Sequence, residues 1–267
     1  MNTKPYTHYL FPPLALVLLS AIMFAFPIGS DWPAYSASLE QIQTPYSIPR
    51  FVGMPFVFFV LPHALVDIDT GNAINLALNI IVIAAVAWKL TGRNWWIAFL
   101  ITMSSPMGIQ LLMSNNIDWL PLSSFLVADW IAYPLLAMKP QMLGGAAIIR
   151  FKRNPNPLHL IPLLGVLIAS IVIWGAWWQH IGGGLMDVKW NFAPFPYLIP
   201  VGCWLLWQAW KTDDEIIAAC ATCFFVPYFA PYSVAGIHVL LASKYRKVAI
   251  WLWVFSWYFV VIASRRM

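Results

Sequence analysis

The sequence predicts an all-α membrane protein, a single polytopic domain over residues 1–267 with about 8–10 transmembrane helices, some of them broken or re-entrant. Hydrophobic residues make up 61% of the chain and charged residues only 9%, whereas a soluble domain carries about 25% charged residues. The apolar runs are continuous. Strands of an outer-membrane barrel would alternate apolar and polar residues, so helices are favoured.

The first apolar run, 9–28, is interpreted as a retained helix rather than a cleaved signal peptide, because it is long for such a peptide and no small-x-small site precedes Asp31. The run 51–66 is a candidate re-entrant segment. Prolines interrupt several runs, and the freed backbone groups need partners from protein or from a water-filled cavity. The prolines concerned are Pro55, Pro62, Pro106, Pro121, Pro134, Pro140, Pro227 and Pro231. The later runs are 72–90, 95–113, 117–138, 142–149, 157–179, 196–210, 215–230, 233–242 and 248–263.

Basic residues predict the orientation, because cytoplasmic loops are rich in lysine and arginine. Lys4 places the N-terminus in the cytoplasm, so residues 29–50 face outward. The rule leaves the path of 215–247 open. We expect a multi-pass protein of a prokaryotic plasma membrane, and the net charge of +5 fits cytoplasmic loops better than a nucleic-acid partner. The other cytoplasmic signals are Lys89 and Arg93, then Arg150, Lys152 and Arg153, then Lys211–Glu215, and finally Lys244, Arg246 and Lys247.

Residues 29–49, GSDWPAYSASLEQIQTPYSIP, form the first polar interval. A carboxylate at the mouth of a membrane helix is a natural place for chemistry at the bilayer surface. Asp31 either marks the end of the first helix or acts as a general base that accepts a proton from an acceptor hydroxyl. Tyr35 and Tyr46 suit sugar recognition by stacking and hydrogen bonding. Glu40 is interpreted as a solvated residue of a short surface helix.

Two further polar groups interrupt apolar sequence. Lys139, in the stretch MKPQ, either neutralises a phosphate as a point charge or extends its ammonium group to a membrane boundary. The stretch SNNIDW, residues 114–119, either binds sugar hydroxyls through its amides and Asp118 or forms a polar loop. Asp129 lies within an apolar run, so it needs a cavity or a partner and remains an unassigned candidate.

Other patterns argue against common kinds of site. The histidines show no metal-ligand spacing, so neither a metal nor another cofactor is expected. Cys220 and Cys223 match a CxxC pattern, but within an apolar run they are interpreted as packing residues. The sequence has no glycine-rich phosphate loop, no serine-centred elbow and no HExxH. A nucleotide-using active site of the soluble type is therefore not expected.

Three stretches together resemble GT-C-type membrane glycosyltransferases, especially the family 87 polyprenol-phosphate-mannose-dependent mannosyltransferases. GSDWPAYSASLEQIQTPYSIPRFVGMPFVFFVLP is similar to the opening of these enzymes, with an Asp, a Tyr, a PY pair and an aromatic, proline-rich segment. SPMGIQLLMSNNIDWLPLSSFL is similar to a later helix start, although Ser114-Asn115 stands where the family has Gly-Gln. LLAMKPQMLGGAAIIRFKR is similar to a KPQ segment before a basic loop. The resemblance covers roughly residues 8–155.

This resemblance implies an inverting transfer of a mannose-like sugar from a polyprenyl-phosphate donor to a lipid, glycan or protein acceptor at the outer face. Asp31 would deprotonate the acceptor, and Lys139, with Arg50, would stabilise the leaving phosphate. Membrane lipids and the lipid-linked sugar are the implied partners, with no divalent metal. The implied substrate-binding residues are Tyr35, Tyr46, Arg50, Asn115, Asn116, Asp118, Lys139 and Gln141.

Two alternatives remain open at this stage. The chain is either such an enzyme or a non-catalytic integral membrane subunit of a larger complex built on the same scaffold, with a tryptophan-rich surface that contacts other subunits. A small transporter ranks third, because transporters tend to show related halves with matching helix breaks, and this sequence shows no such duplication.

Overall fold

The computed structural model describes residues 23–48, 51, 53–181 and 191–264. Within these ranges the regular structure is entirely helical, a mixture of α- and 3₁₀-helices without a strand, as the sequence predicts. The α-helices are α2 (Trp32–Glu40), α3 (Ile68–Thr91), α4 (Trp95–Met103), α5 (Pro106–Ser114), α6 (Trp119–Ser123), α7 (Asp129–Met138), α8 (Pro140–Leu143), α9 (Gly145–Arg153), α10 (Ile161–Trp174), α11 (Ile199–Thr212), α12 (Glu215–Thr222), α13 (Val234–Lys244) and α14 (Arg246–Ser264). The 3₁₀-helices are η2 (Pro45–Ser47), η3 (Pro55–Val60), η4 (Pro62–Leu65), η5 (Gly92–Asn94), η6 (Pro157–Leu160), η7 (Trp177–His180) and η9 (Pro231–Ser233).

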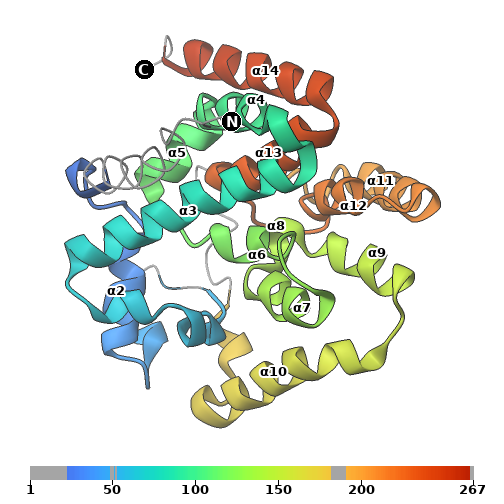
Figure 1. The fold of residues 1–267 in the computed structure, drawn as a ribbon. Helices are drawn as coiled ribbons and strands as arrows, with labels where there is room; N and C mark the ends of the chain where they lie inside the picture. The colour runs from blue at the N-terminus through green and yellow to red at the C-terminus, as the bar shows by residue number, and fades with distance from the viewer. Residues whose placement is uncertain (1–22, 49–50, 52, 182–190, 265–267) are drawn as a thin grey trace, which may run out of the picture.

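Helix α3 is the central element and crosses the middle of the molecule, packed against α4, α6 and α13 (Figure 1). Asp67 caps its start by accepting a hydrogen bond of 2.9 Å from the backbone of Thr70. The helix thus begins at Ile68, four residues before the apolar run 72–90 that the sequence shows. Helix α14 packs on α13, α4 and α5, α11 pairs with α12 beside α9, and α10 packs on α7.

Two apolar clusters flank α3. The larger one joins the second half of α3 to α4, α12 and α13, with Ile83 and Val86 fully buried in it. The second is aromatic and joins α2 and η3 to the end of α10. In it Trp32 stacks on His63 with ring centroids 5.2 Å apart, and Phe56 meets Trp177 edge to face at 5.7 Å. The aromatic cluster includes Trp32 and thus anchors the chain directly after the polar residues Ser30 and Asp31.

Prolines divide the apolar runs much as the sequence predicts. Helices α5 and α8 begin at Pro106 and Pro140, and η3, η4 and η9 also begin at a proline. Two expected interruptions are wrong: Pro134 lies inside α7 and Pro121 inside α6. Pro121 is the third residue of α6 and Pro134 the sixth residue of α7. Near the start of a helix a proline removes few backbone hydrogen bonds, because the first N–H groups have no partner within the helix. The segment 51–66 forms two short 3₁₀-helices.

Two stretches are long and apolar enough to cross a membrane, Ile68–Met103 and Pro157–Trp174. The second is almost wholly unburied: only 6% of its 18-residue window is inside the protein. Of the other expected spans, 248–263 appears as the 19-residue helix α14, whereas the rest are shorter helices in the described ranges, since prolines and polar loops divide them. The sequence predicts a first helix over 9–28, and residues 9–22 of this helix lie outside the described residues.

Four of the basic residues that the sequence predicts to be cytoplasmic form ion pairs with Asp213, Asp214 and Glu215, around the start of α12. Arg153 at the end of α9 bonds Asp213 at 2.8 Å, and Lys244 at the end of α13 bonds Asp214 at 2.6 Å. We call this group, with Arg150, Lys152 and Glu215, the basic cluster.

Candidate functional site

The site is built on the turn that ends α5. Asn115 follows the helix in the left-handed conformation, with φ 49° and ψ 48°, and its N–H bonds the carbonyl of Leu111 at 2.8 Å. Asparagine tolerates this conformation better than most residues because its short polar side chain can bond locally. The turn sends the chain back along α3 and places Asn116 and Asp118 before α6 begins.

Three buried asparagines on α3 hold this turn. Asn72, Asn75 and Asn79 are spaced three and four residues apart, so they lie on one face of the helix. Asn75 donates to the backbone oxygen of Asn115 at 2.9 Å, and Asn79 donates to that of Asn116 at 2.6 Å. Because buried carbonyls need donors, these amides fix the course of the turn through an otherwise apolar interior. Three further hydrogen bonds complete this asparagine ladder. The side-chain amide of Asn115 donates to Asn72 Oδ1, the indole N–H of Trp119 donates to Asn75 Oδ1, and the backbone N–H of Trp119 donates to Asn79 Oδ1.

Asp31 reaches the site because the chain before α2 docks on the end of α5. The N–H of Ser30 bonds the carbonyl of Met113 at 3.1 Å, and the N–H of Asp31 bonds that of Ser114 at 3.0 Å. Gly29 permits this approach. A Cβ there would lie 2.3 Å from the Cβ of Asn115, closer than side-chain atoms can come.

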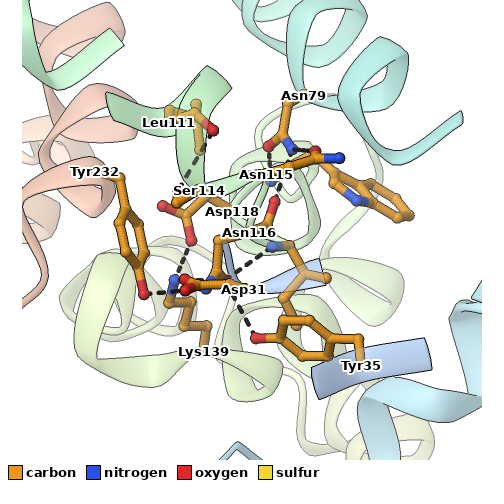
Figure 2. Close-up of polar contacts among 12 residues, drawn as sticks. Asp31, Tyr35, Asn79, Leu111, Ser114, Asn115, Asn116, Asp118, Lys139 and Tyr232 are labelled. Carbon is orange, nitrogen blue, oxygen red and sulfur yellow. Dashed lines mark hydrogen bonds and ion pairs between the residues drawn. The ribbon is translucent and has the colours of Figure 1, made fainter. Parts of the chain in front are cut away.

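The side chain of Asn116 is the centre of the site (Figure 2). Its Nδ2 donates to Asp31 Oδ2 at 2.7 Å and to the hydroxyl of Tyr232 at 3.0 Å. Its Oδ1 accepts from Lys139 Nζ at 3.0 Å and from the hydroxyl of Tyr35 at 3.2 Å. One amide therefore joins a carboxylate, an ammonium group and two phenols from three separate parts of the chain.

Lys139 occupies the break between α7 and α8 that the sequence predicts, with φ −147° and ψ 67°. It is buried and pairs with the buried carboxylate of Asp118 through Oδ1, and its Nζ lies 4.8 Å from the ring centroid of Tyr232. The second oxygen of Asp118, Oδ2, is buried without a hydrogen-bond partner among the described residues. A buried oxygen of this kind is free to accept a hydrogen bond from a ligand.

The two phenols of the site are neutral: Tyr35 donates to Asn116 Oδ1, and Tyr232 accepts from Asn116 Nδ2. Burial raises the pKa of both Tyr35 and Tyr232 well above the ordinary value for tyrosine, and the negative charges of Asp31 and Asp118 raise it further. Both hydroxyls consequently keep their protons at neutral pH. They supply polar contacts without adding negative charge beside the two carboxylates.

Asp31 is only half-buried, unlike Asp118 and Lys139. Its Oδ2 is held by Asn116, whereas Oδ1 has a single longer contact, 3.3 Å, from the hydroxyl of Ser30. Among the described residues no cation pairs directly with Asp31, because Asn116 stands between it and Lys139. A carboxylate that is oriented but not neutralised is well placed to accept a proton.

The structure brings together five of the nine residues predicted for the site and separates three others. Asp31, Tyr35, Asn116, Asp118 and Lys139 form the bonded group described above. The side chain of Asn115 is used within the asparagine ladder, where it is 1% exposed. Tyr46 and Gln141 lie outside the bonded group, and Arg50 lies outside the described residues. Tyr46 donates to the carbonyl of Gly53 at 2.9 Å and stacks on His180 at 5.0 Å.

Sequence reasoning missed Tyr232 and the asparagine ladder. The ladder has a readable signal, since Asn72, Asn75 and Asn79 share one face of an apolar helix and must find polar partners there. Tyr232 has none, because it reaches Asn116 from 116 positions away in the chain. Across the described residues there is no group of three or more His, Cys, Asp or Glu that could hold a metal ion.

Comparisons with known proteins give no relative for this fold and site: no family model, no curated protein and no solved structure matches the chain.

Proposed function

We propose that this chain is a multi-pass membrane glycosyltransferase that moves a mannose-like sugar from a polyprenyl-phosphate donor to a hydroxyl of a lipid, glycan or protein at the outer face of the membrane. The observation that carries the proposal is the Asn116 side chain, which bonds Asp31 on one side and Lys139 on the other. An inverting displacement needs a base at the acceptor hydroxyl and a cation at the leaving phosphate. Asn116 holds a carboxylate and an ammonium group a short, fixed distance apart, as these two roles require.

At the acceptor end, Asp31 is the general base. The acceptor hydroxyl bonds to the half-buried carboxylate, its oxygen attacks the anomeric carbon, and its proton passes to Asp31. The fixed orientation of Asp31 supports this step, because its Oδ2 is held at 2.7 Å by Asn116 and Oδ1 is left for the incoming hydroxyl.

At the donor end, the bond between the anomeric carbon and the phosphate oxygen breaks, and the lipid phosphate leaves with the electron pair. An ammonium group has three N–H donors, and those of Lys139 go to Asp118 and Asn116, which leaves one for the phosphate. The unpartnered Asp118 Oδ2 accepts from a sugar hydroxyl in this arrangement. Charge that develops on the leaving oxygen is thereby stabilised by groups already in place.

The placement of the site along α3 supports action at one membrane surface. Asn75 and Lys89, which lies in the last turn of α3, are 14 residues apart, about 21 Å along an α-helix. The hydrocarbon core of a bilayer is about 30 Å thick. The site and the basic cluster thus lie toward opposite ends of a helix of membrane length, and a cytoplasmic basic cluster places Asp31 near the outer face.

The test is sugar transfer by purified, detergent-solubilised protein, offered radiolabelled polyprenyl-phosphate mannose or glucose with a membrane lipid extract as acceptor. Asp31→Asn should reduce transfer by at least about 100-fold, the usual contribution of a general base. Glu40→Gln is the matched control, because Glu40 is an exposed carboxylate on the same helix, and it should transfer at the wild-type rate. Transfer retained in Asp31→Asn overturns the proposed mechanism.

The second candidate function is a non-catalytic subunit of a larger membrane complex. Exposed aromatic side chains favour it, since Trp204 and Trp207 on α11 and Trp251, Phe255 and Phe259 on α14 all lie on the surface. Aromatic residues are enriched where proteins contact other proteins. No transfer from either donor by folded, lipid-loaded wild-type protein would favour this reading, and so would co-purification with a defined partner subunit.

A further inference from the structure

A second polar site lies in the basic cluster, at the opposite end of α3 from Asp31. There a hollow of about 300 Å³ opens between the ends of α3 and α9 and the start of α12. Its walls combine three cationic side chains, two carboxylates and an apolar floor. The lining residues are Lys89, Leu90, Phe125, Val127, Asp129, Arg150, Arg153 and Glu215.

Arg150 is the unusual member of this lining. Its side chain is only 8% exposed, and its guanidinium lies 5.1 Å from the ring centroid of Phe125. It lies 2.9 Å from Glu215 and 3.7 Å from Asp129, but neither approach has hydrogen-bond geometry, and Nε is buried without a hydrogen bond among the described residues. A guanidinium has five N–H donors, and buried donors in folded proteins are nearly always used.

The other two cations are also incompletely paired. Lys89 is exposed at the rim and has no ion pair or hydrogen bond with any residue that the structure describes. Arg153 uses Nε for a carboxylate oxygen of Asp213 at 2.8 Å and Nη2 for the backbone carbonyl of the same residue, whereas its Nη1 reaches Glu215 only at 3.7 Å. With the neighbouring pair partners included, four cations (Lys89, Arg150, Lys152 and Arg153) face three carboxylates (Asp129, Asp213 and Glu215), which leaves an excess of one positive charge around the hollow.

We propose that this hollow binds the phosphate group of an anionic ligand, either a phospholipid headgroup or a soluble phosphate ester. Two guanidinium groups with unused N–H donors can grip phosphate oxygens in pairs, and the free ammonium of Lys89 adds a point charge. Leu90, Phe125 and Val127 form the apolar part of the lining and suit the carbon portion of an ester. The ligand also supplies hydrogen-bond acceptors to the buried guanidinium of Arg150, which has ion-pair partners but no hydrogen bond at Nε among the described residues.

This site does not depend on the proposed glycosyl transfer. It contains none of the residues bonded to Asn116, and α3 separates the two polar regions by about 21 Å from Asn75 to Lys89. If the basic cluster is cytoplasmic, the hollow faces the leaflet whose anionic lipids attract basic segments. It also assigns a role to Asp129, which lines the hollow and helps to orient Arg150.

Two probes distinguish the sources of the phosphate. In the first, the thermal unfolding midpoint of the full-length protein in detergent is followed against inorganic phosphate, with ionic strength held constant by chloride. In the second, dioleoyl phosphatidylglycerol or phosphatidylcholine is added, and bound lipid is counted by native mass spectrometry. Stabilisation by phosphate alone identifies a soluble ester, and retention of phosphatidylglycerol over phosphatidylcholine identifies a headgroup. Either result supports the site.

The variants are Lys89→Gln and Arg153→Gln, since both side chains are exposed and neither is needed to neutralise a buried carboxylate on its own. Each should weaken binding by about tenfold, the value of one charge-assisted contact. Lys247→Gln, an exposed lysine that does not line the hollow, is the control and should bind like the wild type. Equal binding in all three variants, or no binding of either probe by the wild type, overturns the proposal.

Discussion

The side-chain amide of Asn79 donates a 2.6 Å hydrogen bond to the backbone carbonyl of Asn116, the residue that joins Asp31 to Lys139. The orientation of the site is therefore set by helix α3 and not by the short loop that contains it. Because α3 is also packed against α4, α6 and α13, the position of Asn116 is coupled to the central packing of the protein.

The asparagine ladder should be necessary for stability. Asn75→Leu removes the donor to Asn115 and the acceptor for the indole N–H of Trp119, so buried groups lose their partners. Each such loss costs about 1–3 kcal/mol. The unfolding midpoint in detergent should fall clearly, whereas Asn94→Leu, the same change at an exposed position, should leave it within error. An unfolding midpoint of Asn75→Leu equal to that of the wild type would show that water replaces the hydrogen bonds of the asparagine ladder.

The ion pair of Lys139 and Asp118 should show strong coupling. Lys139→Met or Asp118→Leu alone leaves an uncompensated buried charge, at a cost of about 3–5 kcal/mol. The double variant should lose much less stability than the sum of the losses in the two single variants. Denaturant unfolding of the four proteins measures this, and simple additivity would mean that the two charges do not interact in the folded state.

Gly29 should not accept a side chain. In Gly29→Ala the new Cβ would lie 2.6 Å from the carbonyl oxygen of Ser114 and 2.3 Å from the Cβ of Asn115, and overpacking of this kind costs about 1–3 kcal/mol. Transfer should fall along with stability, because Asp31 moves with the backbone. The control is Gly165→Ala, which meets no atom within 4 Å and should leave both transfer and stability intact or raise the stability slightly.

Acid should loosen the junction of α12 and α13. Burial alone would raise the pKa of Asp214, but hydrogen bonds from Lys244 and Tyr245 outweigh it and hold that pKa below its usual value. A lowered folded-state pKa gives stability that is present above about pH 4 and is lost as the pH falls through the folded value.

The unfolding midpoint should accordingly drop below about pH 4 in the wild type. The drop should be smaller in Asp214→Asn, which starts from a lower midpoint at neutral pH. Parallel pH profiles for the two proteins would assign the acid sensitivity to other carboxylates.

The sequence is sufficient to predict much of the site. Asn116, Asp118 and Lys139 are polar residues that interrupt apolar sequence, and each must find a partner because lipid and core offer none. Their assembly into one bonded group is therefore a consequence of the environment. The helical fold and the proline-bounded starts of α5 and α8 follow from the same composition and from the missing N–H of proline.

Other features depend on tertiary contacts that no local pattern encodes. Tyr232, for example, reaches the site only because η9 packs beside α5. Tyr46 was placed with the sugar-binding residues because of its type and its position near Asp31. The fold instead directs it to His180 and Gly53, since chain proximity fixes neither direction nor partner.

The amide of Asn116 has a further consequence for how Asp31 and Lys139 keep their charges. Both hydrogens of its Nδ2 are donated, and its Oδ1 accepts three bonds, from Tyr35, Lys139 and Ile117. An amide neither gains nor releases a proton near neutral pH, so it acts as an insulator between an acid and a base that it holds in place. Rotated by half a turn, it would direct its NH₂ at an ammonium group and its oxygen at a carboxylate. The amide therefore has one stable orientation, and that orientation fixes which side of it faces the carboxylate and which faces the ammonium group.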